Sequence, residues 1–149
     1  MSPLFSLIPK VGYLAMDRIS RAVRSRVMSR IRSKDTGPEM AVRRLVHGMG
    51  YRYRLHSEKL PGRPDLVFAG RKKVIFVNGC FWHSHEGCKI SRIPKSRICY
   101  WKPKLRGNKR RDKANQRKLS RMGWKYLTIW ECEVKGQKGI SSLIRRFLR

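Results

Sequence analysis

The stretch that decides the fold of this chain is Gly79-Cys80-Phe81-Trp82-His83-Ser84-His85-Glu86-Gly87-Cys88. With Cys132, which follows much later in Trp130-Glu131-Cys132, it supplies three thiols and an imidazole. Such a Cys3His set is typical of a structural zinc ion with four tetrahedral ligands. We therefore predict that zinc is bound by Cys80, His85, Cys88 and Cys132. The alternative is three reduced, buried cysteines and an ordinary surface histidine.

The chain is strongly basic. Its 37 Lys and Arg residues face only 9 Asp and Glu residues, which gives a formal net charge of +28. This charge favours nucleic acid as the partner, because lysine and arginine neutralise phosphates and release counterions. An anionic membrane surface is the rival partner. We expect no membrane contact, because we find no amphipathic helix with a strongly apolar face.

The length and hydrophobic content suit one domain. A chain of 149 residues that is 40% hydrophobic can bury a normal core. No apolar run approaches the roughly 18 residues needed to span a bilayer. The first ten residues contain Pro3 and Pro9 and lack the basic start and cleavage site of a signal peptide. Cysteines with metal-like spacing then fit a reducing cytoplasm, and Cys99, outside the zinc set, is interpreted as a free thiol.

Periodicity and turn residues predict an α/β fold. Residues 18–32 show helical spacing, and a second helix starts at Asp35-Thr36-Gly37-Pro38-Glu39 and ends at Gly50. Residues 51–55 alternate as a strand, and 65–69 and 73–77 read as a hairpin. The other predicted elements are a long basic helix over 102–122, a strand over 124–130 and a helix over 138–148. This order implies a mixed sheet flanked by helices.

Three carboxylates are candidates for chemistry in so basic a chain. Asp65 follows the turn Leu60-Pro61-Gly62-Arg63-Pro64, Glu39 lies in the first turn of a helix, and Asp112 lies on the long basic helix. Carboxylates on a DNA-facing surface repel phosphate unless they hold a cation such as Mg²⁺. The structural alternatives are a turn cap for Asp65, a helix-dipole partner for Glu39 and a salt bridge for Asp112.

Five stretches together resemble a known family. They are Arg32-Ser33-Lys34-Asp35-Thr36-x-x-Glu39, Leu60-Pro61-Gly62-Arg63-Pro64-Asp65, Val77-Asn78-Gly79-Cys80-Phe81-Trp82-His83, Asn108-x-x-Arg111-Asp112 and Gly123-Trp124-x-x-Leu127-x-Ile129-Trp130-Glu131-Cys132. In this order they resemble the very short patch repair (Vsr-type) DNA mismatch endonucleases. The resemblance covers about residues 20–149. It implies a restriction-endonuclease-like PD-(D/E)xK core with a structural zinc, and nicking 5′ of the thymine in T:G mismatches that arise from 5-methylcytosine deamination.

The resemblance also implies roles for the residues that match. Asp65 and the Val77 carbonyl would bind Mg²⁺, and Glu39 would act through a water on the metal. His83 would be the general base for the attacking water, with Asp112 orienting it, and an imidazole suits that role near neutral pH. Asn108 is assigned an auxiliary role. Asn78, also auxiliary, stands where the family's best-known pattern has a second histidine, so it cannot titrate.

Aromatic and apolar side chains match the family's wedges into DNA. Phe81, Trp82 and Trp101 match a trio that enters from the major groove beside the mismatch. Met28 and Ile31 match residues that insert from the minor groove. Wedging unstacks base steps at a cost of a few kcal/mol each, which is least at a weakened mismatch. For Trp101 the alternative is core packing beside Tyr100.

Three functional hypotheses remain at this point. The leading one is a Mg²⁺-dependent mismatch endonuclease whose substrate is double-stranded DNA with a T:G mismatch. Its rivals are a non-catalytic, zinc-stabilised binder of distorted DNA and a nickase of the same fold with another target. We expect a monomer in the cytoplasm, associated with the nucleoid, with mismatch-repair proteins as candidate partners. Residues 16–149 would be a single endonuclease domain, and residues 1–15 a poorly ordered N-terminal extension.

Overall fold

The fold is taken from a computed structural model, which describes residues 20–30, 34–136 and 139–149. The extension predicted over residues 1–15 lies outside these ranges, as does Ile31, and the side chain of Met28 is likewise outside the described part. Over the described ranges, no helix has both the length and the apolar character needed to cross a membrane.

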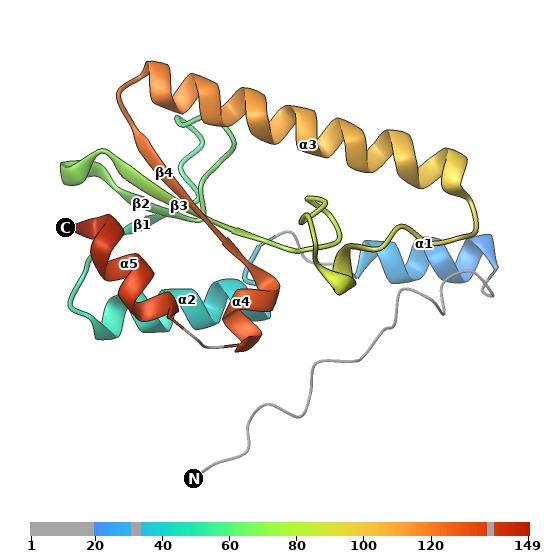
Figure 1. The fold of residues 1–149 in the computed structure, drawn as a ribbon, viewed down its shortest axis with the longest axis horizontal. Coiled ribbons are helices and arrows are strands. Elements are labelled where there is room, and N and C mark those ends of the chain that lie inside the picture. The colour runs from blue at the N-terminus through green and yellow to red at the C-terminus, as the bar shows by residue number, and fades with distance from the viewer. Residues whose placement is uncertain (1–19, 31–33, 137–138) are drawn as a thin grey trace, which may run out of the picture.

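A four-stranded sheet forms the centre of the fold (Figure 1). Its strands are β1 (Arg54–Leu55), β2 (Leu66–Phe68), β3 (Lys73–Asn78) and β4 (Lys125–Trp130), in that spatial order. The pairs β1–β2 and β2–β3 are antiparallel, and β3 and β4 are parallel. A parallel pair needs a crossover connection, which here contains the long helix α3 (Ile98–Arg121). The predicted mixed sheet is confirmed.

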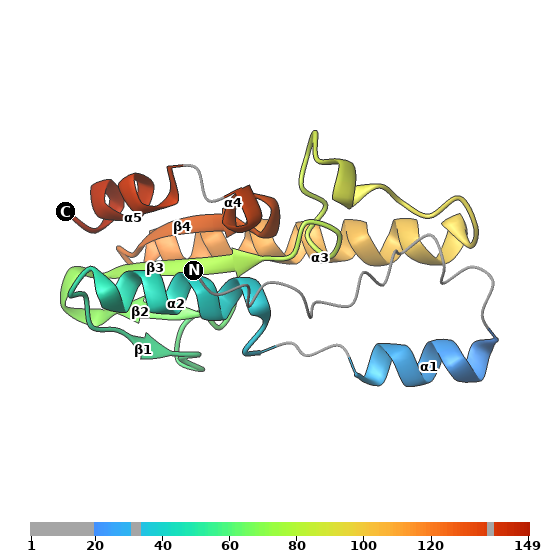
Figure 2. The same cartoon turned by 90° about the horizontal axis from the view of Figure 1, so that it is seen from below.

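Helices cover both faces of the sheet (Figures 1 and 2). Helix α3 lies on one face, and α2 (Gly37–Gly48), α4 (Glu131–Gly136) and α5 (Ile140–Leu148) lie on the other. Helix α1 (Arg21–Ser29) lies beyond the sheet, toward the N-terminal end of α3. The expected flanking of the sheet by helices is therefore observed.

Alternation along the strands divides the core between these two faces. Leu66 and Ile75 pack in a buried cluster with Ile144 of α5, whereas Val67 and Val74 pack in a second cluster with Leu119 of α3. Successive strand residues point to opposite faces, so one hairpin supplies both clusters. Fully burying each of these side chains contributes about 1.5–3 kcal/mol of folding free energy.

Helix α2 begins where its sequence predicts. The Thr36 hydroxyl accepts a hydrogen bond from the Glu39 N–H at 3.4 Å, and Pro38 lies in the first turn. The Thr36 hydroxyl thus gives the Glu39 N–H an acceptor that the helix itself cannot supply. Pro38 has no backbone N–H and so needs no acceptor. This start places Glu39 at the end of the sheet where the functional site lies.

Three elements differ from the expected boundaries. Strand pairing over residues 51–55 is confined to β1, and the Tyr53 hydroxyl before it donates to the Arg43 carbonyl of α2 at 3.1 Å. Helix α3 starts before Pro103, at Ile98. The helix α4 was not predicted; in it the Glu133 carboxylate accepts the Trp130 N–H at 2.7 Å.

Candidate active site and metal centre

The turn before β2 aims Asp65 at the end of the sheet. Gly62 in this turn has φ +80°, and a Cβ there would lie 3.2 Å from both Asn115 Cβ and Phe76 Cε1. Glycine is therefore required both by the backbone conformation and by the close approach to α3. The buried Pro64 follows, and Asp65 leads directly into β2.

Asp65 is a mostly buried carboxylate. Its Oδ2 accepts the Val77 N–H of β3 at 2.7 Å, and 18% of its side chain is exposed. Burial raises the pKa of Asp65 to about 6 against the lowering effect of the Val77 hydrogen bond, and the nearby Glu39 raises it further. A cation beside this carboxylate would offset the cost of holding it ionised.

A buried network joins α2 to Asp65. The Glu39 carboxylate pairs with the Arg43 guanidinium and lies 3.2 Å from His56 Nε2. Arg43 also pairs with Asp35 at 2.7 Å and lies 2.8 Å from His56 Nε2. His56 Nδ1, on the other side of the ring, is 3.9 Å from Asp65 Oδ1. The side chains of Asp35, Glu39 and His56 also lie close enough together to bind a metal ion.

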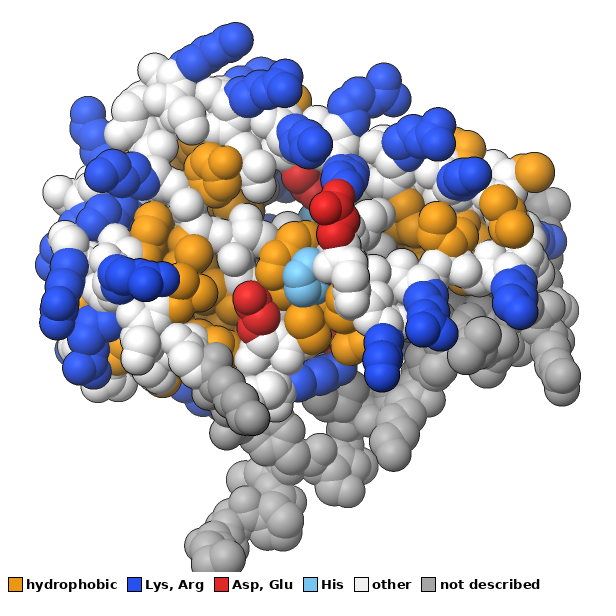
Figure 3. Space-filling view, viewed as in Figure 1, with side chains coloured by type: hydrophobic (Ala, Val, Ile, Leu, Met, Phe, Trp, Pro, Cys, Tyr) orange, Lys and Arg blue, Asp and Glu red, His pale blue; other side chains and the backbone are white. Residues whose placement is uncertain are grey.

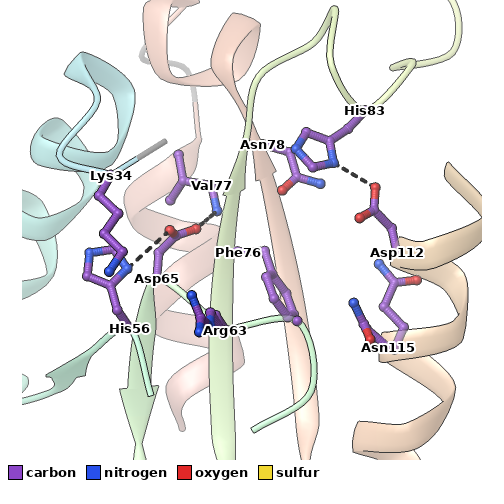
Figure 4. Close-up of a pocket in the computed structure, with 12 residues that line it drawn as sticks. Lys34, His56, Arg63, Asp65, Phe76, Val77, Asn78, His83, Asp112 and Asn115 are labelled. Atoms are coloured by element: carbon purple, nitrogen blue, oxygen red, sulfur yellow. Dashed lines mark hydrogen bonds and ion pairs between the residues drawn. The ribbon is translucent and has the colours of Figure 1, made fainter. Parts of the chain in front are cut away.

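His83 and Asp112 form the opposite wall of the site (Figure 4). His83 lies in the loop after β3, and Asp112 projects from the middle of α3. His83 Nδ1 is 2.6 Å from Asp112 Oδ2. The carboxylate accepts a proton held on Nδ1, so Nε2 has the lone pair that can accept a proton from water.

A pocket of about 330 Å³ connects these two walls. Figure 4 shows Asp65 and His56 on one side and His83 and Asp112 on the other. The pocket also has Asn78, the last residue of β3, in its lining. Its full lining comprises Lys34, His56, Gly62, Arg63, Asp65, Phe76, Val77, Asn78, His83, Asp112, Asn115 and Gln116. The pocket thus combines a carboxylate, an imidazole–carboxylate pair and basic side chains able to contact phosphate.

The four predicted zinc ligands come together beside this pocket. Their ligand atoms all lie within 4.8 Å of one another. His85 Nδ1 is 3.5 Å from Cys80 Sγ and 3.4 Å from Cys132 Sγ, as expected for ligands about 2.0–2.3 Å from one tetrahedral ion. Burial raises the pKa of the Cys80 thiol to about 12, so a cation is needed to hold it as a thiolate. The donor set fits zinc.

The Cys/His cluster includes residues of the loop that carries His83. His85 stacks on Trp130 with ring centroids 4.1 Å apart, and Cys132 follows directly in α4. The Ser91 hydroxyl donates to the Cys88 carbonyl at 2.9 Å and braces the end of the loop. A metal ion here would fix His83, two residues before His85, relative to α3.

The predicted DNA wedges are packed against one another. Phe81 and Trp101 are 1% and 3% exposed and cluster with Leu105, whereas Trp82 is half-buried. The packing of Trp101 follows the core alternative, with Tyr100 edge-on at 5.1 Å. In this conformation Phe81 and Trp101 cannot reach a base stack. Insertion of all three rings therefore stays a prediction that requires the cluster to open.

Two further residues have clear places in the site. Asn108, predicted to be auxiliary, donates from Nδ2 to the Trp82 carbonyl at 3.0 Å and so ties α3 to the loop that carries His83. His56 was not predicted. Its signal in the sequence is its position at the end of the Tyr51–Leu55 alternation, shortly before the turn that leads to Asp65.

The mixed sheet, the carboxylate beside an imidazole–carboxylate pair, and the Cys/His cluster define a DNA endonuclease with a restriction-endonuclease-like core. The catalytic domain of the homing endonuclease I-Bth0305I has a similar fold, with a TM-score of 0.51 and 21% identity over 76% of this chain and 94% of that one. The type II nicking enzyme V.XorIIP of Xanthomonas oryzae pv. oryzae is 46% identical over 132 residues, which are 89% of this chain and 96% of that relative.

The family assignment rests on two further matches. The DNA mismatch endonuclease Vsr of Escherichia coli is 36% identical over 121 residues, covering 81% of this chain and 77% of that relative. The family model for DNA mismatch endonuclease Vsr matches residues 16–89. The chain belongs to the Vsr family of DNA endonucleases, which confirms the resemblance drawn from its motifs.

Proposed function

We propose that this endonuclease nicks double-stranded DNA on the 5′ side of the thymine in a T:G mismatch, with Mg²⁺ as the catalytic ion. The observation that carries the proposal is the His83–Asp112 pair, 2.6 Å apart, in one pocket with Asp65. A binding protein has no need of an oriented imidazole beside a partly buried carboxylate. The pair therefore favours the enzyme over a non-catalytic binder of distorted DNA.

His83 acts as the general base in this proposal. Its Nε2 accepts a proton from the water that attacks the phosphorus atom, and the bond from phosphorus to the leaving oxygen of the strand breaks. Asp112 holds the Nδ1–H tautomer and stabilises the imidazolium that forms. A positioned base of this kind contributes about 10²–10⁴-fold to the rate.

Asp65 is the proposed ligand of the catalytic cation. A bound Mg²⁺ would neutralise charge that builds up on the phosphate as the bond breaks. Asp65 would hold it with the Val77 carbonyl, and Glu39 would act through a water bound to the ion. The Val77 N–H and the Glu39–Arg43–His56 network keep these groups in place before the ion binds.

The aromatic cluster is the proposed detector of the mismatch. Trp82 presents the exposed part of the cluster, and Phe81 and Trp101 lie directly behind it at centroid distances of 5.1 and 6.0 Å. Unstacking a base step costs a few kcal/mol, least at a mismatch, so a T:G pair favours insertion over a matched pair. The zinc cluster gives the loop a rigid base from which to insert.

A nicking assay on matched and T:G duplexes, with Mg²⁺ or with a chelator added at assay time, tests the proposal. We expect nicking of the T:G duplex alone and dependence on Mg²⁺. Equal cutting of both duplexes would instead support a nickase of the same fold with another target. Tight binding of T:G DNA without any cutting would support the binder. Reduced cysteines and a DNA substrate fit a cytoplasmic enzyme acting at the nucleoid, as a monomer.

A further inference from the structure

A groove leads away from the catalytic pocket between α3 and β4. Its inner half is lined by His83, Asp112, Lys113, Gln116 and Thr128, among others, and its outer half by Lys113, Gln116, Arg117, Ser120, Arg121 and Tyr126. Lys113 and Gln116 belong to both halves, so the groove is continuous. His83 and Asp112 belong to both the inner half and the catalytic pocket, so the groove begins at the cutting site.

Four basic side chains follow this groove along one flank of α3. Lys109, Lys113, Arg117 and Arg121 recur every four residues, so each lies beside the next in a stripe that winds slowly around the helix over about 18 Å. Figure 3 shows Lys and Arg side chains gathered over α3. Lys109 pairs with Glu86 at the inner end. Within the described part of the chain, the exposed Arg117 and Arg121 form no ion pair, so their charge is available to an anion. Lys113 also forms none, but it lies within electrostatic range of Glu86, which lines the inner half.

The floor of the groove has groups suited to a nucleotide. Leu127 and Ile129 of β4 pack into the core on the α2 side, so Tyr126 and Thr128 face α3. Tyr126 is 38% exposed and offers a ring on which a base can stack. Thr128 Oγ1 is buried without a hydrogen-bond partner among the described residues. A buried hydroxyl of this kind calls for a polar group or a water from outside.

We propose that this groove binds one unpaired DNA strand next to the cut, with Lys113, Arg117 and Arg121 on its phosphates and Tyr126 against a base. A basic groove with an exposed aromatic ring is the usual arrangement for single strands. Its two halves have volumes of about 300 and 330 Å³. A helix length of about 18 Å corresponds to roughly three to five phosphates of one strand.

The proposal rests on the proposed function only for the position of the cut. A strand that has been nicked and peeled from its complement would be held in the groove. The product that the endonuclease releases would then have a cut strand that is already separated from its complement beside the nick. The duplex with a single-stranded arm beside the mismatch is therefore the ligand that the groove should prefer.

Binding measurements on armed and blunt duplexes test this. In the Asp65→Asn background, which prevents cutting, fluorescence anisotropy would give the affinity for a blunt T:G duplex and for the same duplex with an oligothymidine arm on either strand end. The groove variant is Lys113→Gln/Arg117→Gln. The matched control is Arg145→Gln/Arg146→Gln, which removes the same charge from the exposed face of α5. Lys113→Arg/Arg117→Lys keeps the groove charge and checks that folding is intact.

We expect the groove variant to lose at least fivefold more affinity for one armed duplex than for the blunt duplex. Its salt dependence on that duplex should flatten by about 1.4 in log–log slope, about 0.7 for each lost phosphate contact. Tyr126→Ala should lose about fivefold or more on the same armed duplex. Equal losses on blunt and armed DNA, or equal losses in the control, would overturn the proposal. Failure of the parent chain to nick T:G DNA would refute the proposed function but leave this arm-dependent binding measurable.

Discussion

His83 Nδ1 lies 2.6 Å from Asp112 Oδ2, although the two residues come from the loop that contains most of the Cys/His cluster and from the middle of α3. The short contact fixes the tautomer of the imidazole and directs its second nitrogen toward water. The position of His83 depends on the Cys/His cluster, and the position of Asp112 depends on the packing of α3 on the sheet. The orientation of the His83 imidazole is thus a product of two separate parts of the fold.

Asp112→Asn should therefore lower nicking by about 10²-fold or more, because an amide no longer holds the Nδ1–H tautomer firmly. Binding of T:G DNA should be at least as tight, since a negative charge is removed. Single-turnover nicking rates and DNA titrations measure the two effects. Glu58→Gln removes an exposed carboxylate away from His83 and serves as the control. An Asp112→Asn rate equal to that of the parent would remove Asp112 from the mechanism.

The raised pKa of Asp65 gives a stability prediction. The carboxyl titrates near 3.8 when unfolded and near 6 when folded, so the folded state binds the proton more tightly. The contribution of this group to stability is present at low pH and is lost as the pH rises through about 6. Asp65→Asn avoids that loss and should be more stable than the parent at pH 8, by about 1–3 kcal/mol, but equal to it near pH 3, below the unfolded pKa.

Urea unfolding at the two pH values without Mg²⁺ checks this expectation. Mg²⁺ should reduce the difference at pH 8, because it offsets the cost of the buried charge in the parent alone. An Asp65→Asn variant that is less stable than the parent at pH 8 would show that burying the ionised Asp65 carboxylate does not lower the stability of the folded protein.

Zinc removal should unfold the loop that carries His83. We expect equimolar zinc in the purified protein, and Cys88→Ser should lose it and lower the melting temperature, because structural zinc contributes folding free energy. Elemental analysis and thermal unfolding measure both. Cys99→Ser is the matched control, since Cys99 is exposed and outside the cluster. Folded, active Cys88→Ser protein without zinc would contradict the assignment.

The aromatic cluster predicts two different results for two tryptophans. Trp101→Ala should cost about 3–5 kcal/mol of stability, because this ring is 3% exposed. Trp82→Ala should cost less stability but should weaken T:G binding more than matched binding, by about 1–3 kcal/mol per lost stack. Denaturation and titrations on both duplexes separate the effects. Equal losses of Trp82→Ala on both duplexes would mean that this ring is not a mismatch wedge.

Local patterns predicted the parts of the fold that depend on local chemistry. Ligand spacing predicted the Cys/His cluster, and the Leu60–Asp65 turn predicted a carboxylate at the sheet end. The contacts around His56 were not predictable, because its partners Glu39 and Arg43 come from a separate helix. The burial of Phe81 was missed for the same reason, whereas that of Trp101 had been the alternative to a role as a wedge. Aromatic rings beside a loop look alike in sequence whether they pack inward or point outward.

The position of the nick tests the central claim most directly. A T:G duplex labelled at the 5′ end of either strand, incubated with Mg²⁺ and the parent or the Asp65→Asn or His83→Ala variant, would be resolved at single-nucleotide length. We predict one cut, 5′ of the mispaired thymine, in the parent alone, with both variants slower by about 10²-fold or more. Cutting by Asp65→Asn and His83→Ala at the parent rate would contradict the account, since the hydrolysis would then occur elsewhere.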